Sequence, residues 1–347
     1  MTGRAGEVAT LSVADAVDRL RSADAPERFS PVSGEPLIAV ELGREGRALT
    51  SHELAAARES LRRIPAPSVG LRGGSLGRGA KTLVDHFDVV VNTPNELARL
   101  GERVSANPRA ASTLVQLLRH GETRDVEAGL VAESLAYSTL QAGPEFANWL
   151  AGRARGSLQL DPRPAVRMWR ELDRLYLELD RPEKHNAYSA AMRDALCEGL
   201  ALAVADDHIE EIVFSGAGAS FCSGGDLDEF GTLPDPATAH VIRTTRSAAR
   251  LLARCAERVR AELHGACVGA GIELPAFASR VSARGDAFAL LPELTMGLVP
   301  GAGGTVSLPR RIGRQRTAWL ALSAERLPAE TARDWGLFDE LHAVEPG

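Results

Sequence analysis

Strand-like and helix-like segments alternate from about residue 172 onward, and this alternation constrains the fold more than any other feature of the sequence. Three segments have the apolar runs of strands: LDRLYLELD, IEEIVFSG and VRAELHG. Long helical stretches separate them: AYSAAMRDALCEGLALAVAD after the first and PATAHVIRTTRSAARLLARCAER after the second. Strands separated by helices require crossover connections, which place helices against a sheet. We therefore predict an α/β core in the C-terminal half.

The N-terminal half has a different pattern. Strand signals occur in PLIAVEL, IPAPSVGLRGG and HFDVVVN, and a helical segment, SHELAAARESLRRI, follows the first of them. Amphipathic helices are predicted over residues 93–153, because apolar side chains such as Leu97, Leu100 and Val104 recur at three- and four-residue spacing. The polar, proline-containing stretch ARGSLQLDPRP is predicted to link the two halves. Residues 1–29 are predicted to form a flexible N-terminus, in which VADAVDRLRSA could form a short helix.

Composition and charge exclude several classes of protein. The chain has 347 residues and a formal net charge of −6, which argues against a nucleic-acid partner. Its four cysteines (Cys197, Cys222, Cys255 and Cys267) form no C-x-x-C pair and have no histidine at zinc-ligand spacing. We therefore predict neither a metal site nor a disulfide framework. No segment has the apolar core of a signal peptide or the length of a membrane span, so we expect a cytoplasmic protein with reduced thiols and no membrane partner.

Two glycine-rich loops follow predicted strands. GAGASFCSGGDLDEF comes after EIVFSG, and GACVGAGIEL comes after VRAELHG. Glycines leave backbone N–H groups uncovered, so two such loops can direct two donors at one carbonyl oxygen and stabilise an enolate. Either loop alone is also compatible with a tight structural turn. A nucleotide site is disfavoured, because no G-x-x-x-x-G-K-[ST] motif is present and Phe221 replaces the third glycine of a dinucleotide fingerprint. A serine hydrolase is disfavoured because no G-x-S-x-G motif is present.

Two acids, Glu273 and Glu293, lie in apolar and glycine-rich surroundings between residues 265 and 304. A carboxylate that faces an apolar wall loses hydration, so it must be paired, hydrogen-bonded or protonated, and each state costs free energy. One alternative is that each side chain sits at a helix end with its charge in water. Two such acids beside two exposed-amide loops favour the other interpretation, which is paired general acid and base catalysis.

Four motifs, in their order and spacing, resemble those of the enoyl-CoA hydratase/isomerase family, also called the crotonase family: RPEKHNAYSAAM, FSGAGASFCSGGDLDEF, HGACVGAGIELPAFASRV and LPELTMGLVPGAGGTVSLPRRIG. The resemblance runs from about Leu175 to Leu341. It implies a β-β-α spiral fold that binds an acyl-CoA, with the thioester carbonyl held by two backbone N–H groups. By position these donors belong to Gly225 and Ala270. Many relatives carry glycine at the second place, but a backbone donor needs only its N–H.

The resemblance also implies the remaining site residues. Glu273 and Glu293 fall on the two acids that hydratases of this family use, one to activate water and the other to deliver a proton to the α-carbon. Relatives that only shift a double bond commonly keep just the second acid. Two short segments fall where relatives hold coenzyme A: Lys184, His185, Asn186 and Ala187, and Ser223, Gly224, Asp226 and Leu227. Coenzyme A is part of the substrate, so neither a separate cofactor nor a metal is expected.

The leading hypothesis is therefore an enzyme, a hydro-lyase that hydrates a 2-enoyl-CoA to a 3-hydroxyacyl-CoA. One alternative is double-bond isomerisation or another crotonase reaction, and a second is a non-catalytic acyl-CoA-binding subunit. Two carboxyl groups in apolar surroundings cost free energy, which argues against a subunit that only binds acyl-CoA. The resemblance does not fix the acyl chain, whose pocket would be lined by Phe230, Leu233 and the helices of residues 93–153.

The order of segments departs from the family pattern. Relatives usually continue beyond the GLFDEL segment with helices that close the site and build the oligomer, and here residues 93–153 resemble that region. We predict a permuted or degenerate-repeat arrangement, in which residues 30–92 are a degenerate crotonase-like remnant and residues 154–347 form the catalytic core. Residues 93–153 should then pack against residues 290–341, in the same chain or a neighbour. An unrelated helical extension is the alternative. A homo-trimer or hexamer is expected, because these helices have more apolar surface than one core can cover.

Overall fold

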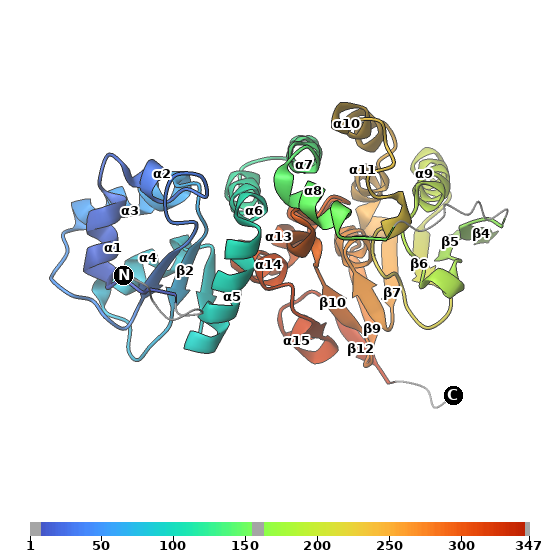
Figure 1. Ribbon diagram of the computed structural model, residues 1–347. Coiled ribbons are helices and arrows are strands. Elements are labelled where there is room, and N and C mark those ends of the chain that lie inside the picture. Colours follow the sequence, from blue (N-terminus) through green and yellow to red (C-terminus); the bar gives the residue numbers. More distant parts are fainter. Residues whose placement is uncertain (1–7, 155–162, 344–347) are drawn as a thin grey trace.

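The computed structural model describes residues 8–154 and 163–343, and its architecture is mixed α/β, as predicted (Figure 1). A small N-terminal lobe, at the left of the view, is built around a three-stranded sheet. A larger lobe, at the right, contains a six-stranded sheet. Helices of the intervening segment lie between and above the two lobes.

The N-terminal lobe is a parallel β-α-β-α-β unit with its own hydrophobic core. Its strands pair in chain order: β1 (Ile38–Glu41), β2 (Ser68–Leu71) and β3 (Val89–Val91). Its helices are α1 (Val13–Leu20), α2 (Ala25–Arg28), α3 (Ser51–Arg63) and α4 (Arg78–Leu83), and a 3-10 turn, η1 (Val84–His86), follows them. Whether this lobe is a remnant of a crotonase core stays a prediction.

Residues 8–29 do not form the flexible terminus that the sequence predicted. The Ser12 hydroxyl accepts a hydrogen bond from Asp15 N and begins α1. Val13, Val17 and Leu20 are buried in the core of the lobe, and Phe29 is enclosed in the same cluster. The predicted short helix is present, but the predicted flexibility was wrong, because the apolar residues of this helix recur at the spacing of one helical face and pack into the core.

The larger lobe contains two sheets. In the main sheet the strand order is β12-β9-β7-β6-β5-β4, and every neighbouring pair is parallel except β4 and β5. Its strands are β4 (Val166–Glu171), β5 (Arg174–Leu179), β6 (Glu211–Gly216), β7 (Val259–Leu263), β9 (Arg280–Arg284) and β12 (Glu340–His342). The second sheet pairs β8 (Ala266–Val268), β10 (Phe288–Leu290) and β11 (Leu327–Pro328). The three strands predicted from the alternation are β5, β6 and β7, and their parallel crossovers are confirmed.

Strand β4 is an element that the alternation did not predict. It forms a hairpin with β5 through a turn in which Leu172 adopts a φ of 55°. Such a turn normally carries glycine or asparagine, so the sequence offers no turn signal at this position.

Helices of the larger lobe cover the sheets and carry the loops between strands (Figure 1). They are α9 (Ala190–Ala205), α10 (Pro236–Thr245), α11 (Ala248–Arg254), α12 (Ala270–Glu273), α13 (Gly304–Ile312), α14 (Arg314–Ser323) and α15 (Ala329–Asp334). The 3-10 turns are η2 (Pro182–Lys184), η3 (Leu227–Glu229), η4 (Ala256–Arg258), η5 (Pro275–Phe277) and η6 (Glu293–Met296). The predicted long helix before β7 is broken, because the Ser247 hydroxyl accepts from Arg250 N and starts α11 separately from α10. Within the described residues, none of the helices is both long and apolar enough to cross a membrane.

Four helices of the intervening segment join the lobes: α5 (Pro94–Ala106), α6 (Pro108–Gly121), α7 (Val126–Gln141) and α8 (Pro144–Ala151). Helices α5 and α6 pack on α14, α6 and α7 pack on α13, and α8 packs on η6. The predicted contact between residues 93–153 and residues 290–341 is therefore confirmed, within one chain. Since these contacts cover apolar faces of the helices, the faces no longer argue for an oligomer.

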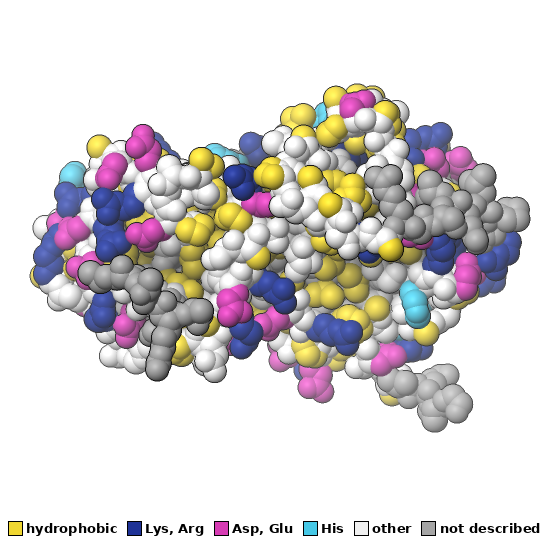
Figure 2. Space-filling view, viewed as in Figure 1, with side chains coloured by type: hydrophobic (Ala, Val, Ile, Leu, Met, Phe, Trp, Pro, Cys, Tyr) yellow, Lys and Arg dark blue, Asp and Glu magenta, His cyan; other side chains and the backbone are white. Residues whose placement is uncertain are grey.

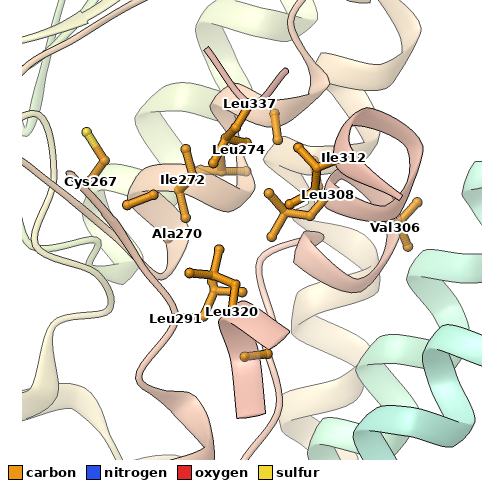
Figure 3. Close-up of a cluster of buried hydrophobic side chains, with 14 of the residues drawn as sticks. Cys267, Ala270, Ile272, Leu274, Leu291, Val306, Leu308, Ile312, Leu320 and Leu337 are labelled. Carbon is orange, nitrogen blue, oxygen red and sulfur yellow. The ribbon is translucent and has the colours of Figure 1, made fainter. Parts of the chain in front are cut away.

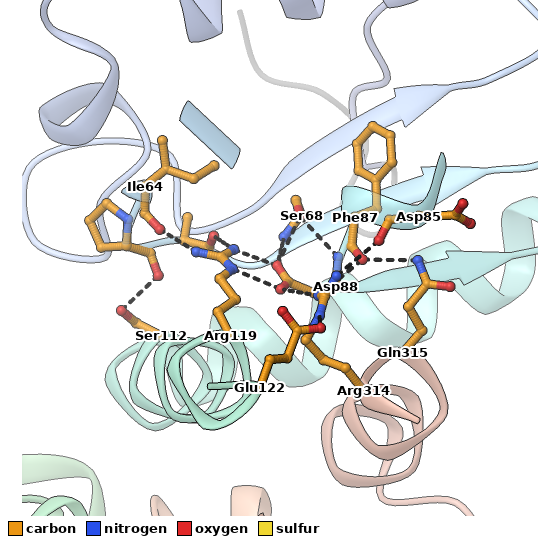
Figure 4. A network of polar contacts seen from close by, with 12 residues as sticks. Ile64, Ser68, Asp85, Phe87, Asp88, Ser112, Arg119, Glu122, Arg314 and Gln315 are labelled. Atoms are coloured by element: carbon orange, nitrogen blue, oxygen red, sulfur yellow. Dashed lines mark hydrogen bonds and ion pairs between the residues drawn. The ribbon is translucent and has the colours of Figure 1, made fainter. Parts of the chain in front are cut away.

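A buried polar network also fastens the small lobe to the rest of the chain (Figure 4). Asp88, which precedes β3 and is 1% exposed, accepts hydrogen bonds from the Ser68 backbone and hydroxyl. Its carboxylate also accepts from Arg119 of α6 at 2.8 Å and from Arg314 of α14 at 3.2 Å. Gln315 donates to the Phe87 carbonyl at 3.0 Å beside it. One carboxylate thus joins three parts of the chain that are far apart in sequence.

The core of the larger lobe runs directly beneath the glycine loops. Side chains from α12, α13 and α14, among them Ile272, Leu308 and Leu320, pack into one cluster with Cys267 of β8 (Figure 3). On the face shown in Figure 2, charged side chains of both signs are spread over the small lobe and the outer edges, whereas hydrophobic side chains gather toward the middle of the molecule. The loops that carry the candidate site therefore rest on a packed, apolar base.

Candidate active site

The two predicted glycine loops lie side by side. Cys222 and Cys267 form a parallel bridge, in which Val268 N donates to the Cys222 carbonyl at 2.9 Å. A Cβ added to Gly269 would lie 3.6 Å from the Cα of Gly224, so the loops touch at their glycines. Gly269 itself has a φ of 49° and a ψ of −120°, a conformation that strongly favours glycine.

Each loop presents one uncommitted backbone donor. Within the described residues, neither Gly225 N–H nor Ala270 N–H donates a hydrogen bond to another protein atom. Ala270 is the first residue of α12, and the N–H groups of a first helical turn have no partner inside the helix. Both residues line the same cavity. Two backbone donors without a partner among the described residues therefore lie in the wall of one cavity.

Glu273 ends α12 and is held rigidly. Its side chain is 2% exposed, and its Oε2 atom accepts from Ala302 N at 2.7 Å and from Gly304 N at 2.9 Å. Burial raises the pKa of this carboxyl well above its ordinary value, and the negative charges of Glu293 and Glu133 raise it further. The two backbone donors act in the opposite direction. Among the described residues, no hydrogen bond to its second oxygen, Oε1, is found.

Glu293 begins η6 and faces Glu273. Its Oε1 atom lies 2.6 Å, and the Oε1 atom of Glu273 3.8 Å, from the position that a Cβ on Gly269 would occupy. The Oε2 atom of Glu293 is buried and has no hydrogen-bond partner among the described residues. Burial raises the pKa of Glu293 to about 8. A buried oxygen without a partner is rare, so this atom fits a protonated carboxyl or one that awaits a ligand.

A third buried acid, Glu133, reaches the same cavity from α7. It is 2% exposed, and it accepts from Gly303 N at 2.7 Å, Thr305 N at 2.8 Å and the Thr305 hydroxyl at 2.6 Å. Burial raises its pKa to about 7. Sequence reasoning missed this residue. The available signal was a lone acid among small and apolar residues in AGLVAESLAYSTL, which is also typical of a solvated helix position.

The two segments predicted to hold coenzyme A lie in different places relative to the cavity. Ser223, Gly224, Asp226 and Leu227 line the cavity with Gly225, whereas the segment 184–187 lies outside its wall. Asn186 is fully enclosed, accepts from Arg181 N and donates to the carbonyls of Ala217 and Ser220, so its side chain holds the loop.

The charged residues of that segment are already partly committed. Lys184 forms ion pairs with Asp226 at 3.7 Å and Asp228 at 3.4 Å. His185 is exposed, with a φ of 51°, and its Nδ1 atom lies 3.3 Å from the Ser220 hydroxyl. Ala187 is partly exposed between these elements. The polar side chains of this segment that reach the surface are therefore those of Lys184 and His185, whereas Asn186 is enclosed.

The cavity has a volume of about 430 Å³, and both halves of the chain form its wall. Helix α7 contributes Leu130, Glu133, Ser134, Tyr137 and Gln141. Phe230 closes one side, and its ring lies 6.5 Å from that of Phe146 and 5.8 Å from that of Trp149, both on α8. Leu233 does not line the cavity and is exposed, contrary to the prediction. The predicted contribution of residues 93–153 to the wall is confirmed.

The raised pKa values predict that the folded protein loses stability as the pH rises. The folded state keeps Glu293 protonated up to about pH 8, whereas the unfolded chain releases that proton near the ordinary pKa of 4.5. The stabilisation is complete below pH 4.5 and is lost as the pH passes through the folded pKa of about 8. One such group contributes a slope of about 1.4 kcal/mol per pH unit in this window.

Urea unfolding across this pH range measures the slope. The unfolding free energy should fall toward alkaline pH, and Glu293→Gln should reduce the slope and raise the free energy at the alkaline end. An unchanged slope in the variant would show that Glu293 ionises at its ordinary pKa.

Comparison with known proteins identifies the family that the C-terminal half resembles. Residues 175–346 match the family model described as "Enoyl-CoA hydratase/isomerase". The 1,2-epoxyphenylacetyl-CoA isomerase of Escherichia coli (strain K12) is 36% identical over 166 residues, which are 46% of this chain and 63% of that protein. The 2,3-dehydroadipyl-CoA hydratase of the same organism is 35% identical over 169 residues, 48% of this chain and 65% of that protein.

A solved structure gives a similar picture. The enoyl-CoA hydratase from Thermoplasma volcanium GSS1 is 35% identical, and the match covers 52% of this chain and 72% of that chain with a TM-score of 0.48. The chain therefore spans a little under two thirds of the length of these two curated relatives and matches both hydratases and isomerases. The matched part, residues 175–346, lies in the larger lobe. Through residues 175–346, the chain belongs to the enoyl-CoA hydratase/isomerase family.

Proposed function

We propose that the protein hydrates a 2-enoyl-CoA to a 3-hydroxyacyl-CoA. The observation that carries the proposal is the placement of the Oε1 atoms of Glu273 and Glu293 over one face of Gly269. Both acids line the cavity that also contains the free donors of Gly225 and Ala270. A water molecule between two carboxyl groups, next to a polarised thioester, is the arrangement that water addition requires.

In this mechanism the thioester carbonyl oxygen accepts hydrogen bonds from Gly225 N–H and Ala270 N–H. Addition at the β-carbon moves charge onto that oxygen, so the two donors bind the enolate more strongly than the ground-state carbonyl. One such donor is worth about 3 kcal/mol in the transition state. Ala270 suits this role because its side chain is not used.

The two acids divide the proton transfers. One carboxylate accepts a proton from water as the water oxygen bonds to the β-carbon, and the other carboxyl group gives its proton to the α-carbon. The net result is addition of H and OH across the double bond, with no redox change. The pKa of Glu273 lies well above its ordinary value and that of Glu293 at about 8, which supports a pair that holds one proton near neutral pH.

Coenzyme A enters as part of the substrate, and the proposal needs neither a separate cofactor nor a metal. Ser223, Gly224, Asp226 and Leu227 lie at the cavity wall where the pantetheine arm would pass. Lys184 and His185, at the nearby surface, would then contact the phosphate-bearing end.

Double-bond isomerisation is the second candidate, and one observation favours it. The Oε2 atom of Glu273 already accepts two backbone hydrogen bonds, whereas Oε2 of Glu293 has no partner among the described residues. Glu293 by itself could therefore move a proton between two carbons of the substrate. Among the relatives, the 1,2-epoxyphenylacetyl-CoA isomerase is an isomerase by its name, although the substrate that it names is an epoxide. The non-catalytic acyl-CoA-binding subunit is less well supported, because three buried acids are costly in a site that only binds.

A panel of 2-enoyl-CoA and 3-enoyl-CoA thioesters separates these functions. Loss of the conjugated thioester absorbance with 2-enoyl-CoAs, and formation of 3-hydroxyacyl-CoA, supports the hydratase. A gain of that absorbance with 3-enoyl-CoAs alone would instead identify an isomerase. Tight binding of acyl-CoA without turnover of any thioester would instead support the non-catalytic binding subunit.

Gly269→Ala tests whether the contact point of the two loops is part of the site. The added methyl group would lie 2.6 Å from Oε1 of Glu293 and would require the positive φ of 49°. We expect kcat to fall by roughly tenfold or more, since displacement and strain of 1–3 kcal/mol act on the acid itself. Gly74→Ala is the matched control, because Gly74 also has a positive φ but nothing within 4 Å of an added Cβ. Equal kcat values for the two variants would contradict the proposed geometry.

We also propose a homo-trimer or hexamer in the cytoplasm. Strand β4 is an edge of the main sheet, and Met168, Trp169 and Leu172 of its hairpin are 50%, 38% and 92% exposed. An exposed apolar edge strand of this kind suits pairing with another copy. The four cysteines are unpaired, which supports a reducing compartment. Light scattering at micromolar concentration tests the assembly, and a monomer would exclude it.

A further inference from the structure

Two carboxylates, one from each half of the chain, share the loop that begins α13. Ala302 N and Gly304 N donate to Glu273, whereas Gly303 N and Thr305 N donate to Glu133. Four consecutive backbone donors thus alternate between the two acids. The N–H groups at the start of a helix need acceptors and favour negative charge, so each acid helps to fix the loop that the other uses.

Close packing of α7 on α13 brings Glu133 to this loop. Gly129 lies one turn before Glu133 on the same helical face, and a Cβ there would come 2.9 Å from Cγ2 of Val306 on α13. The missing side chain at Gly129 therefore allows α7 to approach α13 closely. Tyr137, one turn after Glu133, packs on Gly301 at the other end of the loop.

We propose that Glu133 is a positioning residue of the active site, supplied by the N-terminal half, which orients Glu273 through the loop 301–305 and keeps a third carboxyl group beside the acid pair. The inference rests on the proposed acid and base roles of Glu273 and Glu293. It assigns part of the catalytic apparatus to a helix that lies outside the matched residues 175–346. Within the described residues, no group of three or more His, Cys, Asp or Glu is arranged to hold a metal ion, so the acids are not explained as metal ligands.

The charge of Glu133 acts on both catalytic acids. Its negative charge raises the pKa of Glu273 and of Glu293, by like-charge repulsion. The groups that face Glu133 are Tyr137 on its own helix, Thr305 of α13, and Arg243 of α10, whose positive charge lowers the pKa of Glu133. Arg250 of α11 lines the same cavity, and His240 of α10 binds the neighbouring Ser134 hydroxyl.

Glu133→Gln removes the charge while keeping the shape of the side chain. We expect kcat to fall roughly tenfold with KM within a few-fold, and both limbs of the pH profile to move to lower pH by about one unit. Glu133→Asp keeps the charge but is one methylene shorter, so kcat should fall while the limbs move less. A residue that only stabilises the fold is not expected to give this difference between the Gln and Asp variants in the pH profile.

Glu145→Gln is the matched control. Glu145 is another buried acid that accepts from two backbone donors at a helix start, here Arg109 N at 2.9 Å and Ala110 N at 3.0 Å of α6, but it does not line the cavity. The control should lower the melting temperature without moving the pH profile. A pH profile that moves equally in both variants, or in neither, would overturn the inference.

A second measurement does not depend on turnover. In protein labelled with ¹³C at the glutamate carboxyl groups, NMR follows the titration of Glu273 and Glu293, whose signals are assigned by their loss in the Glu→Gln variants. The two midpoints should fall in Glu133→Gln and stay in place in Glu145→Gln. Unchanged midpoints would refute the inference even if the protein is a hydratase, whereas shifted midpoints without turnover of any enoyl-CoA would refute only the proposed function. If Glu133→Gln does not fold, Thr305→Val removes the hydroxyl donor and should move the midpoints in the same direction.

Discussion

Glu273→Gln and Glu293→Gln should each lower kcat by at least about a hundredfold, which is the lower range for a positioned general acid or base. Glutamine has nearly the shape of glutamate but can neither accept nor deliver the proton. Both carboxyl groups are close to one point over Gly269, at 3.8 and 2.6 Å, so each is placed to act on the same bound water. Steady-state kinetics with the best 2-enoyl-CoA of the panel measures the loss.

Substrate binding should change little in the same variants. In the proposed complex the CoA moiety would contact other residues, so the Kd for a non-reactive acyl-CoA should stay within a few-fold, and removal of a desolvated charge can stabilise the fold. The double variant should lose less than the product of the two single losses, because the acids act as a unit. Glu145→Gln, whose acid lies outside the cavity wall, should keep its turnover.

An isomerase would give a different pattern. Glu293→Gln would abolish activity, whereas Glu273→Gln would retain most of it, since one acid then moves the proton. Near-wild-type turnover in both single variants would exclude acid and base catalysis by this pair and leave the cost of burying the two groups unexplained.

The acid pair and the glycine loops could be predicted from sequence because their chemistry is local. A strand followed by exposed-amide glycines has a recognisable composition, and an acid between apolar residues is conspicuous. The bridge between Cys222 and Cys267 then brings the two loops together, as parallel strands of one core would. The alternation of strands and helices after residue 172 predicted the sheet for the same reason, because the spacing of apolar residues within each segment identifies it as a strand or a helix.

Glu133 could not be found in this way, because its partners lie far away in the chain. Gly303 is 170 residues from Glu133, and a lone glutamate in an amphipathic helix is more often solvated. The helix in VADAVDRLRSA was predicted, but its burial was not, since a few valines and leucines are diluted among charged residues over 8 positions. Asn186 is an example of the opposite error, in which a ligand contact was predicted for a structural residue. Its place in a motif suggested contact with coenzyme A, whereas its enclosed side chain hydrogen-bonds only to backbone atoms.

Asp88→Ala should lower the free energy of unfolding by about 3–5 kcal/mol, the usual effect of breaking a buried ion pair by removing one partner. The carboxylate is 1% exposed, and its loss leaves two guanidinium groups, on Arg119 and Arg314, without their shared acceptor. Among the described residues, Arg119 then keeps only the Ile64 and Ala66 carbonyls, whereas Arg314 keeps its ion pair with Glu122 at 3.0 Å. The uncompensated charge of Arg119 is costly because it is desolvated at the contact between the small lobe, α6 and α14 (Figure 4). Urea unfolding followed by circular dichroism measures the change.

Asp85→Ala is the matched control, because Asp85 lies in the same segment but has an exposed side chain, and its substitution should change the unfolding free energy by less than about 0.5 kcal/mol. If Asp88→Ala is too unstable to purify, Asp88→Asn retains one acceptor for Ser68 N and should show a smaller loss. The same network holds α6 beside α14, and α6 also packs on α7, which carries Glu133. Asp88→Ala should therefore reduce turnover as well as stability. A loss below about 1 kcal/mol would mean that water reaches both guanidinium groups, and that apolar packing of α5 and α6 on α14 alone joins the two halves of the chain.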